Sequence, residues 1–388
     1  KYILFQTIRF ISIGVLTHLA FISTRFTTSL YAIDKDASTF TIGTILSLFS
    51  LIPMLISVRI GRWIDQSGPL SPTITGIILL IVGALFPLMF SYQTADLAPL
   101  LVSATLVGTG FTLSILSMQQ HLGESSKPED RSTVFSWFAM GVSVSGFVGP
   151  ILSGIIIDAV SHRPAFLIPI ISSIVALIFL CFGQKPKHKN SPPSELKKGK
   201  NPFQLLRFTD LRDVLIVTGI ISMCWDLQNF VIPIHGAQIG FSASKIGGIF
   251  GAFAVATFAI RIFMPTVRKF TTEWQVLLGT LGCVSCCFFL FPFVKSYAAF
   301  LGIALILGLG LGAAQPNIMT LVHTTAPHNR VAEALGLRLT VIHGNQVLLP
   351  IIFGAFGTAL GTSAIFWTVT FIALAGVIFI LRKEKHRR

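Results

Sequence analysis

The chain has 388 residues, of which 53% are hydrophobic and only 11% are charged, and its mean hydropathy is +0.78. Because soluble domains carry about 25% charged residues, this composition excludes an ordinary soluble protein and predicts an integral membrane protein. A net charge of +14 can indicate nucleic-acid binding, but here the charges follow the predicted sides of the membrane. We therefore expect no nucleic-acid partner.

Long uncharged stretches predict membrane-spanning helices, since a helical span needs about 20 apolar residues. The stretches are continuously apolar, unlike the alternating strands of an outer-membrane barrel, so the fold class is predicted to be an all-α integral membrane protein. The twelve predicted spans are residues 5–32, 40–60, 72–92, 98–121, 132–159, 164–183, 212–236, 243–265, 274–294, 297–322, 334–359 and 362–381.

Most basic residues fall on one side of this predicted topology. The first segment, the turns after even-numbered spans and the C-terminal tail hold 24 of the lysines and arginines, and 5 lie towards the other side. The positive-inside rule then predicts cytoplasmic termini, and we expect a bacterial inner (plasma) membrane. The run "KPKHKNSPPSELKKGK" predicts a cytoplasmic linker, 185–211, between six-helix bundles at 1–184 and 212–388.

The two halves of the chain resemble each other at an offset of about 200 residues. The matched pairs are Gly108 with Gly308, Pro150 with Pro350, Gly154 with Gly354, Gly43 with Gly247, and Arg25 with Asn229. Together they predict a duplicated six-helix unit and pseudo-symmetric bundles. In transporters built from such repeats the substrate site lies near the midplane, where the halves meet.

The stretch "GRWIDQSGPL" (61–70) is predicted to be a charged turn after the second span. With the twelve-span plan and the basic linker, it resembles the major facilitator superfamily, whose signature at this place is G-x-x-x-D-R-x-G-R-R/K. Gly61, Asp65 and Gly68 are in register, whereas Gln66 replaces the usual arginine and Pro69–Leu70 the basic pair.

That resemblance implies that Gly61, Asp65 and Gly68 contact the eleventh span and help to close the cytoplasmic side. Small residues at helix ends permit such close approach. Arg59, Arg62 or Arg131 can supply the basic partner that the signature here lacks. An ordinary polar turn is the alternative.

The fifth span resembles the antiporter-type motif of the same family, G-x8-G-x3-G-P-x2-G-G. The matching positions are Ser136, Ser145, Gly149, Pro150, Ser153 and Gly154, with serine for glycine three times. Small residues at this spacing form one packing stripe, and proline bends the helix. The resemblance implies a rocking seam at Gly149, Pro150 and Gly154, and favours export.

Asp226 is the only carboxylate predicted deep in a span, where it forms a polar and aromatic cluster with Trp225, Gln228 and Asn229. An intramembrane ionisable residue marks a pathway more often than not, and desolvation favours the neutral form of a carboxyl group. We predict that Asp226 carries the coupling proton. The alternatives are a ligand for a cationic substrate and a structural partner of an arginine or histidine.

Arg25 lies in the first span, at the repeat position of Asn229. Its permanent charge requires an anion or water, so it is either a substrate ligand or a structural ion pair. If Arg25 and Asp226 face each other, protonation of Asp226 frees Arg25 for substrate.

Uncharged polar side chains recur in spans ten and eleven. The predicted substrate contacts are Gln315, Asn317, His343, Asn345 and Gln346, and the predicted gate or headgroup contacts are Arg261 and Arg338. His343 can titrate near neutral pH, although a structural interhelical histidine is equally compatible with its place.

No catalytic constellation, phosphate loop or zinc spacing occurs, so neither an enzyme nor a cofactor or metal site is predicted. The expectation is a monomeric secondary active transporter in the bilayer that exports a small amphipathic organic solute (drug, siderophore or metabolite) by alternating access, with proton antiport. One alternative is a proton symporter or facilitator that imports an organic anion. Another is a lipid-translocating or non-transporting regulatory membrane protein.

Overall fold

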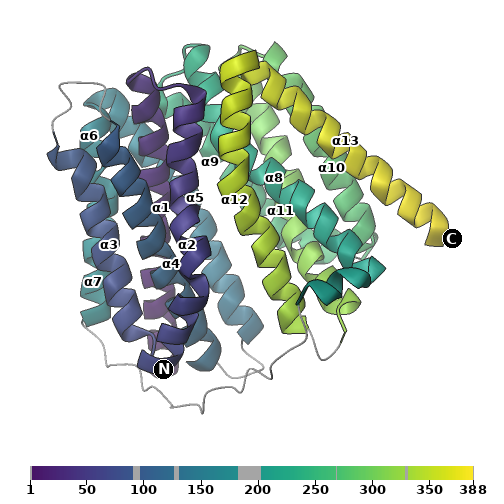
Figure 1. Ribbon diagram of the computed structural model, residues 1–388, viewed down its shortest axis with the longest axis horizontal. Coiled ribbons are helices and arrows are strands. Elements are labelled where there is room, and N and C mark those ends of the chain that lie inside the picture. The colour runs from purple at the N-terminus through teal and green to yellow at the C-terminus, as the bar shows by residue number, and fades with distance from the viewer. Residues whose placement is uncertain are drawn as a thin grey trace. The chain divides into compact units, whose positions relative to one another are not determined.

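The computed structural model describes residues 2–90, 97–125, 131–181, 202–267, 269–327 and 331–387. Over these ranges all regular structure is helical (Figure 1). The α-helices are α1 (Tyr2–Asp34), α2 (Thr39–Ser67), α3 (Leu70–Met89), α4 (Ala98–Ser125), α5 (Arg131–Ala159), α6 (His162–Ala165), α7 (Leu167–Cys181), α8 (Thr209–Gln238), α9 (Ala243–Val267), α10 (Glu273–Leu290), α11 (Tyr297–Thr325), α12 (Val331–Leu360) and α13 (Thr362–Arg387). The 3-10 helices are η1 (Pro202–Arg207) and η2 (Phe291–Phe293).

Twelve segments of the described helices are long and apolar enough to cross a membrane. This confirms the all-α membrane class and the predicted number of spans. The sixth span, predicted as one helix, is divided into α6 and α7 at Phe166. Residues 202–207, predicted as linker, form η1.

The stretch 61–67 is helical, where the sequence analysis predicted a turn. α2 continues to Ser67 and ends at Gly68, whose φ of 74° lies in the left-handed region and whose N–H donates to the Ile64 carbonyl at 2.9 Å. A helix of 29 residues is about 43 Å long, which exceeds a hydrocarbon core of about 30 Å. Charged residues therefore mark the end of the apolar part of α2, not the end of the helix.

Contacts divide the chain into two units. Unit 1 comprises Lys1–Ser194 and Gly240–Gly251, and unit 2 comprises Glu195–Ile239 and Ala252–Arg388. The first turns of α9 thus belong to unit 1. Within unit 1, α1 packs against α4, α5 and α7, and within unit 2, α8 packs against α11, α12 and α13. The bundle limits at residues 184 and 212 stay a prediction.

Individual side-chain contacts repeat between the units. In unit 1, His18 of α1 contacts Ser145 of α5, and in unit 2, Ser222 of α8 contacts Asn345 of α12. The first member of each pair is offset by 204 residues and the second by 200, which are the offsets found in the sequence.

Close packing at glycine also repeats between the two units. A Cβ atom on Gly108 would collide with the Phe49 carbonyl, and one on Gly308 with the Phe253 carbonyl. α4 and α11 can therefore approach α2 and α9 closely only because these positions lack a side chain. The duplication proposed from sequence is confirmed at Gly108 and Gly308.

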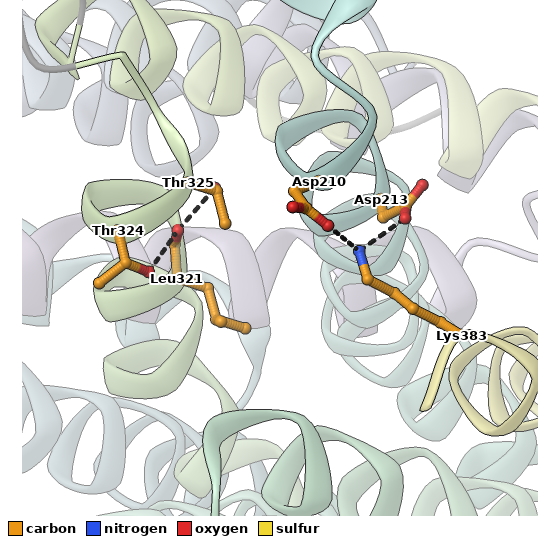
Figure 2. A network of polar contacts seen from close by, with 6 residues as sticks. All are labelled: Asp210, Asp213, Leu321, Thr324, Thr325 and Lys383. Atoms are coloured by element: carbon orange, nitrogen blue, oxygen red, sulfur yellow. Dashed lines mark hydrogen bonds and ion pairs between the residues drawn. The ribbon is translucent and has the colours of Figure 1, made fainter. Parts of the chain in front are cut away.

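The first turns of α8 are held by a lysine near the end of α13 (Figure 2). Lys383 Nζ lies 2.6 Å from Asp213 Oδ2 and 3.0 Å from Asp210 Oδ1, and it lies 4.5 Å from the centre of the Trp274 ring. These contacts join α8, α10 and α13 at one end of unit 2.

Candidate functional site

The predicted polar cluster of α8 consists of buried and half-buried residues. Asp226 is 4% exposed and Gln228 is 1% exposed. Trp225 packs edge-on against Phe253 of α9, with ring centres 5.1 Å apart. Asn229 is half-buried and its amide donates to the Trp225 carbonyl at 3.0 Å. Four polar or aromatic groups within five residues thus occupy a helix whose other buried side chains are mostly apolar.

Spans ten and eleven contribute a second polar group in unit 2. Arg338 of α12 is buried, and its guanidinium donates to Oε1 of Gln315 on α11. Asn317 is buried and donates to the Ala313 carbonyl at 2.8 Å. The structure therefore joins a predicted gate residue, Arg338, to a predicted substrate contact, Gln315.

α12 carries the remaining predicted substrate contacts. His343 Nδ1 lies 3.3 Å from Gln346 Oε1 on the same helix. The Asn345 amide donates to the Gly219 carbonyl of α8 at 2.8 Å and to the Ser222 hydroxyl. Asn345 therefore ties α12 to α8, and its donor is used within the protein.

The small-residue stripe of α5 lies against α1 and the first turns of α9, all within unit 1. A Cβ atom on Gly149 would lie 3.1 Å from Ile22 Cγ2, and one on Gly154 would lie 2.5 Å from the Ala243 carbonyl oxygen. Reciprocally, a Cβ atom on Gly247 would lie 2.5 Å from the Pro150 carbonyl oxygen. The two helices meet backbone to backbone, as small residues allow.

Asp158 completes this junction from the last turn of α5. Its Oδ1 accepts the Ala243 N–H at 2.9 Å and its Oδ2 accepts the Ser244 N–H at 2.8 Å. A carboxylate from another helix thus satisfies amides at the N-terminus of α9 that have no partner within the helix. Sequence reasoning missed Asp158, because a charged residue at the end of a span is ordinary.

Replacing Asp158 with alanine is expected to speed amide exchange in residues 240–251 about fivefold, because loss of an N-cap acceptor costs on the order of 1 kcal/mol. Hydrogen–deuterium exchange measured by mass spectrometry tests this, with Asp158→Asn giving an intermediate rate. The capping box of α10, formed by Thr272 and Gln275, is the internal control. Equal amide exchange rates in the variant and the parent would contradict the capping role of Asp158.

Of the predicted gate residues, the side chains of Asp65, Arg62 and Arg131 and the surroundings of Gly61 lie outside the described part of the structure. Their backbones belong to α2 and α5, and Gly68 ends α2. Arg261 is a half-buried residue of α9, and Arg25 is a half-buried residue of α1. Their roles stay predictions.

The chain matches a known protein family over most of its length. The family model described as Major Facilitator Superfamily matches residues 10–344. The chain is 24% identical over 366 residues to the uncharacterized MFS-type transporter YuxJ of Bacillus subtilis, covering 89% of this chain and 88% of that protein. It is 22% identical to Multidrug resistance protein 1 of Bacillus subtilis, covering 81% and 79%.

A solved structure shows the same fold. The nucleoside transporter NupG is similar with a TM-score of 0.80 at 11% identity, covering 97% of this chain and 99% of that one. At this identity the likeness concerns the fold alone, and it extends over nearly the whole chain.

Proposed function

Since the chain belongs to the major facilitator superfamily of membrane transporters, we propose that it exports a small amphipathic organic solute by alternating access in exchange for protons. The observation that carries the proposal is the Asp226 carboxyl group, which is buried 17 residues after the start of α8 and 12 before its end. A proton-accepting group far from both helix ends suits a coupling site near the midplane.

In this cycle Asp226 takes up a proton from the outer side and releases it to the cytoplasm. A shift between the two states requires that each ligand binds one state better than the other. Proton and solute thus bind alternately, and the predicted contacts on α8, α11 and α12 hold the solute. The predicted membrane is the bacterial inner membrane, with cytoplasmic termini.

Two observations support export of an amphipathic solute. One relative is named Multidrug resistance protein 1, and the α5 stripe resembles the antiporter motif of the family.

The solute is first selected by a thermal-shift screen of the purified protein against drugs, siderophores, sugars and carboxylates at two pH values. Transport of the selected compound is then measured in proteoliposomes with an imposed pH gradient. Asp226→Asn is expected to abolish the gradient-driven component of transport while the thermal shift with the compound remains, because the amide keeps the shape but cannot carry the proton.

Asp36→Asn is the matched control, since it makes the same chemical change in an exposed turn. Asp36 has a φ of 54°, a conformation that asparagine tolerates. Undiminished gradient-driven transport in Asp226→Asn would contradict the proposed coupling role. Normal proton coupling in Asp36→Asn would show that the loss in Asp226→Asn comes from this position and not from the removal of any one negative charge.

Import of an organic anion together with a proton is the second candidate. It is favoured by Arg25, a half-buried cation in α1. The two candidates differ in direction: a gradient that is acidic outside drives solute out under antiport and in under symport.

A further inference from the structure

An apolar groove of about 420 Å³ runs along one face of α8 in unit 2. Its floor is formed by residues of α8 at helical spacing of three and four, from Arg212 through Leu215 and Gly219 to Met223. Leu206 of η1 and Val341 of α12 form its sides. Positions so spaced share one side of a helix, so the groove follows the axis of α8.

Gly219 keeps the middle of the groove empty. A Cβ atom at this position would meet only Val341 Cγ1, at an ordinary contact distance of 3.4 Å. A larger side chain here would therefore extend into the groove without colliding with the backbone. Ile216, beside it, is 42% exposed, so the groove is open at this level.

The groove has one charged end. Arg212 lies in the first turn of α8 and is exposed. Its side chain has no hydrogen bond or ion pair with any residue in the described ranges, whereas the nearby Asp210 and Asp213 both contact Lys383 (Figure 2). At the far end the Asn345 amide donor is occupied by α8. The groove thus offers a cation at one end and hydrocarbon along the rest.

The dimensions fit one leaflet of a bilayer. Eleven residues separate Arg212 from Met223, a rise of about 16 Å along the helix, and the hydrocarbon core is about 30 Å thick. α8 is one of the candidate spans, and Arg212 lies in its first turn. A molecule that matches the groove is acidic near the start of α8 and apolar along the next three turns of the helix.

We infer that the groove binds one anionic phospholipid, with its phosphate on Arg212 and an acyl chain along Leu215, Gly219 and Met223. The charge of Arg212 selects an acidic headgroup, and the apolar stripe supplies the hydrophobic contact. The site is independent of the direction of transport and of the role of Asp226.

Native mass spectrometry of the full-length protein tests this with phosphatidylglycerol and phosphatidylcholine that carry the same acyl chains. The parent is expected to retain phosphatidylglycerol more tightly, and Arg212→Gln is expected to weaken that retention about fivefold. Arg207→Gln, which removes the same charge from exposed Arg207 of η1, is the matched control and keeps the preference. Equal behaviour of the two arginine variants would overturn the inference.

Gly219→Leu tests the acyl-chain part of the site, because its side chain fills the groove. It is expected to lose retention of phosphatidylglycerol while its Tm without lipid stays near that of the parent. A variant that unfolds is replaced by Gly219→Ala, which is expected to weaken retention in part. Unchanged retention in a folded Gly219→Leu would overturn the inference, as would transport of dodecyl phosphate that also displaces the lipid, since the groove would then be a solute site.

Discussion

Replacement of Gly154 by alanine is expected to reduce transport of the selected solute at least about fivefold. The added Cβ atom would lie 2.5 Å from the Ala243 carbonyl oxygen and 2.9 Å from Ser244 Cα. These are backbone atoms and cannot rotate away, so α5 and α9 must separate. Overpacking of this kind costs about 1–3 kcal/mol, which shifts a two-state equilibrium by about 5-fold to 150-fold.

Gly146→Ala is the matched control in the same helix, since a Cβ atom on Gly146 meets nothing within 4 Å. Both substitutions raise helix propensity by the same amount, so any difference reports the contact with α9. Transport rates in proteoliposomes, after size-exclusion chromatography has shown that both variants are folded, decide the matter. Equal rates for the two variants would show that the close approach at Gly154 is not needed in the cycle.

Lys383→Ala is expected to give the largest loss of stability, because it strands two carboxylates that share one ammonium group. The side chains of Lys383 and Asp213 are 11% and 12% exposed, so their pairing is poorly screened by water. Removing one partner of a buried pair costs about 3–5 kcal/mol. We expect the lower end of that range, since Asp210 is 55% exposed and recovers its hydration.

Thermal unfolding in detergent measures this loss, with Arg382→Ala as control because Arg382 is the exposed neighbour. Lys383→Ala is expected to lower the Tm by at least about 5 °C, and Arg382→Ala to leave it nearly unchanged. The double variant Asp213→Asn, Lys383→Met removes both charges and should regain most of the loss. A Tm for Lys383→Ala equal to that of the control would show that the pair contributes nothing to stability.

The number of spans was predictable because lipid offers no partner for backbone polar groups, so every apolar run of sufficient length must be helical. The ends of the helices were not predictable, because a helix that continues beyond the hydrocarbon core can carry charged side chains. The stretch 61–67 illustrates this: Arg62 and Asp65 indicated a turn, and the helix continues past both.

Sequence reasoning found the polar groups of the candidate site but not their partners. Asn345 was predicted to contact solute, and its amide donor is bound to Gly219 and Ser222 of α8. The depth of a polar group in a span implies only that the group needs a hydrogen-bond partner. It does not show whether that partner is solute or protein. The sequence offsets of 204 and 200 residues could have predicted this contact, because they pair Ser222 with His18 and Asn345 with Ser145.

The ion pair of Lys383 was also not predictable from the sequence. In the sequence this lysine belongs to a basic tail, and 170 residues separate it from Asp213. No local pattern predicts an ion pair across that distance, because it depends on α13 crossing the first turns of α8 within unit 2.

One interhelical hydrogen bond occurs in both halves of the duplicated chain, but different side chains form it in each half. In unit 1, His18 Nδ1 lies 2.6 Å from the Ser145 hydroxyl, which itself donates to the Val142 carbonyl, whereas the counterpart in unit 2 is an amide bonded to a hydroxyl. An imidazole nitrogen donates or accepts according to its tautomer, whereas a carboxamide nitrogen only donates. One inherited contact has therefore been rebuilt with different donors and acceptors, while the two positions that form it have stayed in place.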